Sequence, residues 1–157
     1  MVGLAADVLQ RARYWGLRIA TAESCTGGMV AAALTDVPGA SDVVDCGFVT
    51  YSNAAKVEML GVNPATLHDH GAVSEPVARE MAEGALRRSQ AGVAVSITGI
   101  AGPGGSVFKP EGRVCFGLAR QGGETRVETV EFGARGRAQV RKAATEHALA
   151  LLAAAIG

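Results

Sequence analysis

The sequence has no excess of charge of either sign, and it is short of charged and aromatic residues. Lys and Arg total 15 of the 157 residues and Asp and Glu also total 15, so the formal net charge is zero. A chain without net positive charge has no global field that attracts nucleic acid or an anionic membrane, although a local basic patch stays open. We therefore expect neither a nucleic acid nor a membrane as a partner.

Cysteine is scarce as well. Cys25, Cys46 and Cys115 are odd in number and far apart, with no C-x-x-C pair. This usage argues against a disulfide framework and a thiolate zinc site, and it is typical of a reducing compartment. No apolar run approaches the roughly 20 residues of a membrane-spanning helix. The first arginines follow the N-terminal apolar stretch, whereas in a signal peptide they precede it. We expect a cytoplasmic protein.

Glycine is the abundant residue, with 21 positions, close to twice the usual share of about 7%. Between the glycines, segments typical of strands alternate with segments typical of helices. Strands are expected at 17–22, 45–51, 92–98, 112–120 and 125–132, and helices at 4–15, 28–34, 53–60, 74–88 and 135–156. This alternation predicts an α/β fold, a three-layer α/β/α sandwich. The turn signal at 121–124 predicts an antiparallel pair within a mixed, mostly parallel sheet. We expect one domain, residues 1–157.

Two expected strands end in glycine-containing loops that carry Ser or Thr, at 23–28 and 98–105. In open α/β sheets, ligands bind beyond the carboxyl ends of strands, where helix N-termini expose N–H groups. The glycines either make tight turns or let the backbone approach an anion closely. Neither loop contains G-K-[ST] or G-x-G-x-x-G, so hydrolysis of a nucleoside triphosphate is not expected.

Ser24 stands where a strand ends and a helix is about to begin, which is the setting of a nucleophile elbow. A helix N-cap explains Ser24 equally well. None of the three histidines is placed by spacing to complete a Ser-His-Asp triad. A serine nucleophile needs a base, and Lys56 is a better candidate for it than the histidines. Ser-Lys is a known variant of serine catalysis, and burial lowers the pKa of a lysine. Tyr51 is placed to relay a proton or to orient a substrate. An exposed Lys56 on a short helix stays the alternative.

Two other groups of polar residues are candidate ligand sites. His68-Asp69-His70 offers too few ligands for a metal, and we expect it to be solvated. Arg135, Arg137, Arg141 and Lys142 gather at the start of the last expected helix, where positive charge opposes the helix macrodipole. These side chains are either simply solvated or face an anionic ligand.

Four blocks of the sequence resemble a known family. They are TAESCTGG at 21–28, VTYSN at 49–53 leading to Lys56, GAVSE at 71–75 and TGIAGPGG at 98–105. In this order, and over nearly the whole chain, they closely resemble the C-terminal domain of the CinA family, including its stand-alone PncC-type amidases. The resemblance implies an α/β/α domain that hydrolyses the carboxamide of nicotinamide mononucleotide to nicotinic acid mononucleotide and ammonia.

By position, the resemblance implies Ser24 as nucleophile, Lys56 as its base and Tyr51 as an active-site hydroxyl. It implies substrate-binding residues in the two loops and in the pattern R-x-x-V-R: Thr26, Gly27, Gly28, Thr98, Gly99, Gly102, Gly104, Arg137 and Arg141. No metal and no organic cofactor is required. The expected partner is a small nucleotide substrate, and the Ala-rich apolar composition adds the expectation of a homodimer. The chain departs from the family at Gly136, usually Asp, and at Arg113, commonly Thr.

Two other functions remain open from the sequence. One is a non-catalytic interaction module associated with competence or DNA damage, and the other is a serine amidohydrolase for another small amide or phosphorylated nucleoside. The balanced charge and the shortage of aromatic residues among basic ones weigh against direct DNA binding.

Overall fold

A computed structural model describes residues 1–106 and 108–157. Its strands form one sheet in the order β2-β1-β3-β4-β5. They are β1 (Ile19–Glu23), β2 (Val44–Val49), β3 (Val93–Gly99), β4 (Arg113–Arg120) and β5 (Arg126–Glu131). β1 pairs in parallel with β2 and β3, whereas β4 is antiparallel to both β3 and β5. The mixed, mostly parallel sheet is therefore confirmed, including the antiparallel pair around the predicted turn.

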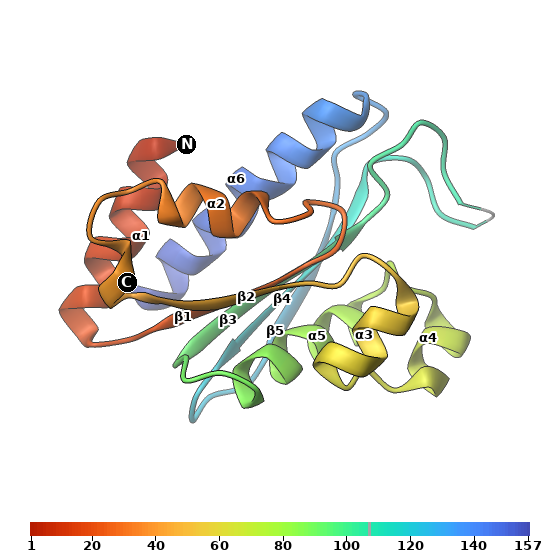
Figure 1. The fold of residues 1–157 in the computed structure, drawn as a ribbon. Helices are drawn as coiled ribbons and strands as arrows, with labels where there is room; N and C mark the ends of the chain where they lie inside the picture. Colours follow the sequence, from red (N-terminus) through yellow and green to blue (C-terminus); the bar gives the residue numbers. More distant parts are fainter. Residues whose placement is uncertain (107) are drawn as a thin grey trace.

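Helices cover both faces of the sheet, which confirms the three-layer α/β/α sandwich (Figure 1). On one face lie α1 (Val2–Trp15), α2 (Met29–Thr35) and α6 (Arg137–Ile156), and on the other α3 (Asn53–Leu60), α4 (Pro64–His70) and α5 (Glu75–Arg87). A short 3₁₀ helix, η1 (Ala40–Asp42), precedes β2. Each face has its own apolar core, with Leu9 and Leu149 in the first and Leu60 and Met81 in the second. Within the described residues, every helix is too short or too polar to cross a bilayer.

Capping side chains, backbone conformation and strand pairing set where the helices and strands begin and end. α5 begins after Ser74, whose hydroxyl accepts the N–H of Val77 at 3.4 Å, with Pro76 in the first turn. α6 begins at Arg137, two residues later than predicted, because Gly136 has φ +92°, which a helix does not accommodate. The predicted strand at 45–51 also ends early, at Val49, which is paired with Glu23, the last residue of the neighbouring strand β1.

The parallel strands place three loops at one edge of the sheet. Glu23, the last residue of β1, is paired with Val49 of β2 and with Ile97 of β3. The segments that follow these three strands therefore leave the sheet side by side. This is the edge at which an open α/β sheet binds its ligands.

Candidate active site

Ser24 lies in a tight turn directly after β1. Its N–H donates to the carbonyl oxygen of Ile97 at 2.9 Å, and its own carbonyl oxygen accepts the N–H of Gly27 at 3.0 Å. The side chain is 7% exposed. The N-cap of α2 is Gly28, so the alternative interpretation of Ser24 as a helix N-cap is wrong. The structure instead presents Ser24 at a sharp strand-to-helix turn, the geometry of a nucleophile elbow.

Lys56 reaches Ser24 from the first turn of α3. Its Nζ lies 3.0 Å from the Oγ of Ser24, 2.9 Å from the carbonyl oxygen of Thr50 and 3.1 Å from that of Tyr51. The side chain is only 1% exposed, so the alternative of a solvated Lys56 is wrong. Burial disfavours the charged amine and lowers the pKa of Lys56 from 10.5 to about 8.

The backbone carbonyls of Thr50 and Tyr51 fix both the position and the orientation of the Lys56 amine. A charged ammonium has three N–H bonds, and it donates one to each of the three acceptors. A neutral amine has two N–H bonds and one lone pair. When both N–H bonds stay with the carbonyls of Thr50 and Tyr51, the lone pair faces the hydroxyl of Ser24. The free amine is thereby oriented to take the proton of Ser24.

The lowered pKa of Lys56 makes the stability of the fold depend on pH. Between about pH 8 and 10.5 the unfolded chain holds a proton on this amine that the folded chain lacks. The free energy of unfolding therefore rises with pH, by roughly 1.4 kcal/mol per unit and about 3 kcal/mol in all. We expect urea denaturation to show the stability of the wild type rising relative to Lys56→Met from pH 7.5 to 10. A pH-independent difference would contradict the lowered pKa.

Cys25 adjoins Ser24 and is the other chemically reactive side chain at this edge. Burial raises the pKa of its thiol to about 11. At neutral pH the thiol is protonated, and a protonated thiol is a poor nucleophile. Ser24, with an amine base in contact, is therefore the better nucleophile of the two.

Tyr51 contributes to the site through two different groups. Its carbonyl oxygen contacts the lysine amine, as described above, whereas its hydroxyl accepts a hydrogen bond from Nη2 of Arg137 at 2.9 Å. Nη1 of Arg137 donates to the carbonyl oxygen of Gly102 at 2.6 Å. The side chain of Tyr51 is 62% exposed. The phenol of Tyr51 therefore contacts Arg137, whereas the main-chain carbonyl of Tyr51 contacts Lys56 of the Ser24–Lys56 pair.

These residues surround a cleft of about 230 Å³ at the carboxyl edge of the sheet. A larger apolar groove of about 280 Å³ lies around Leu118 between β4, β5 and α6, but of the two only the cleft contains the Ser–Lys pair. The cleft is lined by Ser24, Cys25, Tyr51, Asn53, Lys56, Ala72, Val73, Thr98, Gly99, Ala101 and Arg137. Six of the predicted site residues lie here: Ser24, Tyr51, Lys56, Thr98, Gly99 and Arg137.

The other predicted substrate-binding residues lie around the cleft without lining it. Four of them belong to the turn after Ser24 or to its support from α6, and two belong to the loop after β3. Within the part of the chain that the structure describes, the lining excludes Thr26, Gly27, Gly28, Gly102, Gly104 and Arg141. Gly104 donates its N–H to the carboxylate of Glu111 at 2.6 Å. Their contact with a substrate stays a prediction.

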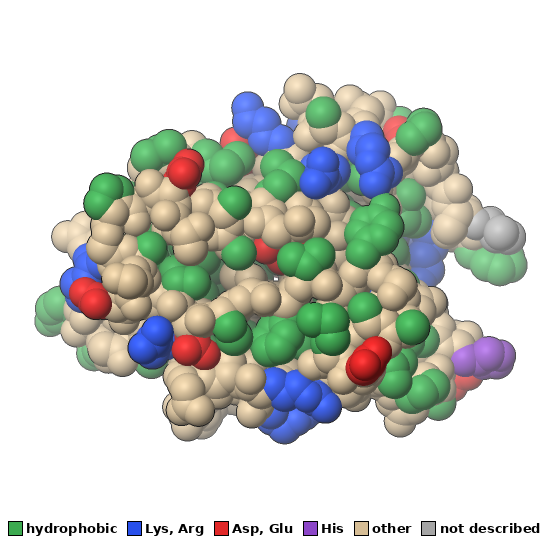
Figure 2. All heavy atoms as spheres, viewed as in Figure 1, with side chains coloured by type: hydrophobic (Ala, Val, Ile, Leu, Met, Phe, Trp, Pro, Cys, Tyr) green, Lys and Arg blue, Asp and Glu red, His purple; other side chains and the backbone are tan. Residues whose placement is uncertain are grey.

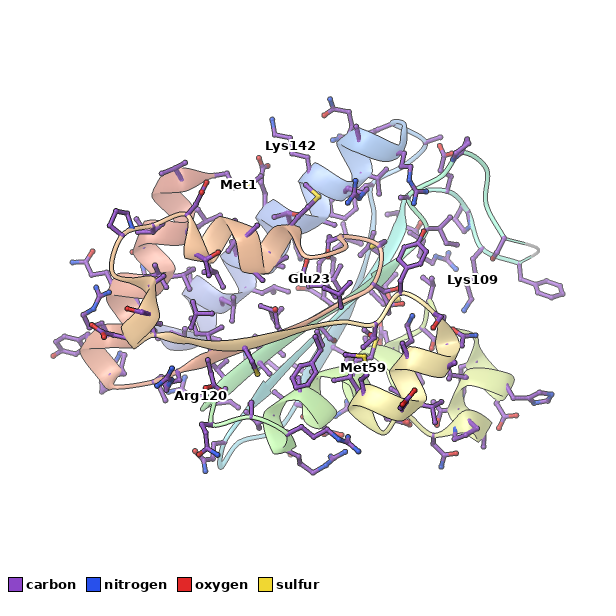
Figure 3. All side chains as sticks on the ribbon, in the orientation of Figure 1. Met1, Glu23, Met59, Lys109, Arg120 and Lys142 are labelled. Carbon is purple, nitrogen blue, oxygen red and sulfur yellow. The ribbon has the colours of Figure 1, made fainter. Side chains whose placement is uncertain are left out.

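Glu23 belongs to the block at 21–28 but is not among the predicted site residues, and the structure makes it a further functional candidate. It is fully buried at the end of β1, next to α2 (Figure 3). Its carboxylate accepts the hydroxyl of Thr26 at 2.6 Å and the N–H groups of Gly28, Val30 and Ala31 at 3.2, 2.9 and 3.0 Å. Glu23 was expected in the loop at 23–28, after the strand predicted at 17–22, so its burial could not be recognised from the sequence. A buried carboxylate requires hydrogen-bonding partners.

The remaining polar features lie away from the cleft. His68 and Asp69 are exposed on α4, as expected for a solvated segment, and bond to each other at 3.1 Å. Among the described residues, no group of three or more side chains is arranged to hold a metal ion. Arg113 pairs with Glu131 at 2.5 Å on β4 and β5, so this departure from the family pattern does not alter the cleft.

The family model described as the CinA C-terminal domain matches residues 2–156. CinA-like proteins of Akkermansia muciniphila and Mycobacterium tuberculosis are 56% identical over 135 residues and 50% identical over 151 residues. These matches cover 85% and 96% of the chain but 32% and 35% of the two relatives. The chain thus spans about a third of the length of these curated relatives.

Solved structures agree with the sequence matches over almost the whole chain. A competence/damage inducible protein from Agrobacterium tumefaciens is 47% identical with a TM-score of 0.95, covering 98% of this chain and 93% of that one. A CinA superfamily protein from Escherichia coli is 38% identical with a TM-score of 0.93, covering 98% and 90%. The names of these four proteins state no reaction.

Proposed function

Because the chain belongs to the CinA C-terminal domain family, we propose that it is an amidase that converts nicotinamide mononucleotide to nicotinic acid mononucleotide and ammonia. The observation that carries the proposal is the buried contact between the amine of Lys56 and the hydroxyl of Ser24 at 3.0 Å. A lysine with a pKa near 8 is suited to act as a base near neutral pH. A nucleophile, its base and an adjacent cleft are the parts that amide hydrolysis needs.

The first half of the reaction forms an acyl-enzyme. The neutral amine of Lys56 takes the proton of Ser24, and Oγ adds to the carboxamide carbon to give a tetrahedral oxyanion. As the C–N bond breaks, the ammonium of Lys56 returns the proton to the departing nitrogen, which leaves as ammonia. Lys56 therefore acts first as a general base and then as a general acid.

The second half releases the acid. Lys56, neutral again, takes a proton from water, whose oxygen attacks the ester carbonyl. The ester bond then breaks, Ser24 recovers its proton from Lys56, and nicotinic acid mononucleotide leaves. Every proton transfer uses a side chain of the cleft, so the proposal includes no metal and no organic cofactor.

We propose that Arg137 binds the phosphate of the nucleotide. Its guanidinium lines the cleft and is held by two neutral oxygens, those of Tyr51 and Gly102. Within the described residues it forms no ion pair with a carboxylate. An entering phosphate can replace the phenol of Tyr51 as acceptor and give a charge-assisted, bidentate contact.

Replacing Arg137 by methionine is expected to weaken binding selectively. The KM for nicotinamide mononucleotide should rise about 10- to 100-fold with little change in kcat, because a hydrogen bond to a charged group contributes about 1.5–3 kcal/mol. Nicotinamide riboside, which lacks the phosphate, serves as the control substrate and should be turned over equally by both proteins. An equal loss on both substrates would contradict the role of Arg137.

The experiment that tests the proposed function compares ammonia release from nicotinamide mononucleotide, its riboside and nicotinamide. We expect the mononucleotide to have the highest kcat/KM. Preference for another small amide would support the alternative serine amidohydrolase. The other alternative is the non-catalytic interaction module, and the charge distribution does not favour direct DNA binding by it: on the face shown in Figure 2, Lys and Arg side chains form separate groups without a continuous band.

A further inference from the structure

The turn that follows Ser24 is held from two sides by side chains of opposite charge. On one side, the buried carboxylate of Glu23 accepts the hydroxyl of Thr26 and three N–H groups at the start of α2. On the other side, Arg141 of α6 donates from Nε to the carbonyl oxygen of Cys25 at 3.0 Å and from Nη2 to that of Thr26 at 3.4 Å. We call Glu23 and Arg141 the elbow clamp.

Gly27 allows the arginine to approach the turn closely. It adopts φ +58°, and a Cβ at this position would lie 3.3 Å from Nη2 of Arg141. A side chain here would crowd the guanidinium and strain the backbone. The glycine thus serves the contact between the turn and α6.

The clamp leaves two N–H groups beside the nucleophile without a protein acceptor. Among residues 1–106 and 108–157, the N–H groups of Cys25 and Thr26 donate to no backbone or side-chain oxygen, whereas those of Ser24 and Gly27 are bonded. Carbonyl and N–H point in opposite directions in a trans peptide. The bond from Arg141 to the carbonyl of Cys25 therefore also sets the direction of the Thr26 N–H.

We propose that Glu23 and Arg141 are positioning residues that hold the turn so that the N–H of Cys25, which lines the cleft, serves as a donor of the oxyanion hole. The N–H of the residue after the nucleophile is the usual donor at a nucleophile elbow. The inference rests on the proposed function, since the oxyanion forms on the carboxamide oxygen when Ser24 adds. It gives Arg141 a role different from the substrate contact that the family resemblance implies.

The arrangement of both side chains explains why they act through the turn. Glu23 is fully buried. The guanidinium of Arg141 is occupied by two carbonyl oxygens, and this residue lies outside the lining of the cleft. Donors that are already aligned with the developing negative charge lower the barrier without strengthening ground-state binding. Loss of the clamp should therefore reduce kcat and leave KM unchanged.

Arg141→Met is the test variant, and Lys142→Met is the matched control. Lys142 is the neighbouring positive charge on α6, and its side chain points away from the sheet (Figure 3). We expect Arg141→Met to lower kcat for nicotinamide mononucleotide about 10- to 100-fold, with KM unchanged and the midpoint of the pH profile still near 8. Lys142→Met should retain the wild-type rate. Arg141→Lys should recover part of the loss, because an ammonium can still donate to the carbonyl of Cys25.

Two results would overturn the elbow clamp. The first is a wild-type kcat for Arg141→Met, and the second is a raised KM with unchanged kcat, which would make Arg141 a substrate contact. Glu23→Gln is a second variant in case Arg141→Met fails to fold, and thermal unfolding identifies such a failure. Glu23→Gln should show the same fall in kcat at constant KM, and a wild-type kcat in this variant would also overturn the proposal.

A substrate-independent probe separates this inference from the proposed function. A fluorophosphonate reacts with the hydroxyl of Ser24: the O–P bond forms, fluoride leaves and Lys56 takes the proton. Its phosphonyl oxygen needs the same N–H donor, so Arg141→Met should be labelled about 10-fold more slowly than the wild type. If the wild type is labelled faster than Arg141→Met but releases no ammonia from nicotinamide mononucleotide, the proposed substrate is wrong and the elbow clamp is supported. Equal labelling of both proteins would overturn the clamp alone, and an unlabelled, inactive wild type would overturn both.

Discussion

Replacing Ser24 by alanine is expected to lower the rate of ammonia release from nicotinamide mononucleotide by at least ~10⁴-fold, because no other group in the cleft can form the acyl-enzyme. Cys25 is the only neighbouring candidate in the described lining, and burial raises the pKa of its thiol to about 11. The fold should tolerate the change. The hydroxyl accepts one of three hydrogen bonds from the amine of Lys56, and such a bond contributes about 1 kcal/mol.

Ser41→Ala is the control for this experiment, since Ser41 is exposed in η1, far along the chain from the elbow. Both variants should unfold within a few degrees of the wild type, and only Ser24→Ala should lose activity. If Ser24→Ala kept turnover within tenfold of the wild type, the assignment of the nucleophile would be wrong.

Lys56 is expected to set the pH dependence of the reaction. With the pKa of Lys56 near 8, kcat/KM should fall about tenfold for each pH unit below 7 and reach a plateau above pH 9. The neutral amine is the active form, so activity increases as the proton is lost. Steady-state assays from pH 5.5 to 9.5 measure this profile, and a flat profile would exclude a lysine base with this pKa.

Two substitutions at Lys56 separate base catalysis from positive charge. Lys56→Met should lower kcat about 10³-fold, within the range of general-base catalysis. Lys56→Arg keeps the charge but cannot release a proton near neutral pH, so it should be equally inactive. Substantial activity in Lys56→Arg would show that the residue acts through its charge alone.

The location of the cleft could be predicted from the sequence, because it depends on strand order and on residue type. Strands that run in parallel end at the same edge, so a serine after β1 and a lysine shortly after β2 were expected to approach each other. The orientation of Lys56 could not be predicted in this way. It depends on the carbonyls of Thr50 and Tyr51, and every residue type has a carbonyl.

The roles of the charged residues could also be predicted only in part, because several of their contacts are with backbone groups. Arg137 and Arg141 lie one helical turn apart and were both expected to bind substrate. Only Arg137 lines the cleft, because the guanidinium of Arg141 is used by the turn after Ser24. Glu23 was expected in the loop at 23–28, whereas the structure places it at the buried end of β1, where a carboxylate must be hydrogen-bonded. Its partners are backbone N–H groups, so residue types did not reveal them.

We propose that this chain hydrolyses the carboxamide of nicotinamide mononucleotide by means of Ser24 and Lys56. The most direct measurement quantifies ammonia and nicotinic acid mononucleotide released by the wild type at pH 8. We expect the wild type to release equal amounts of the two products and Ser24→Ala to release neither. A wild type that releases neither product, or equal release by wild type and Ser24→Ala, would contradict this proposal.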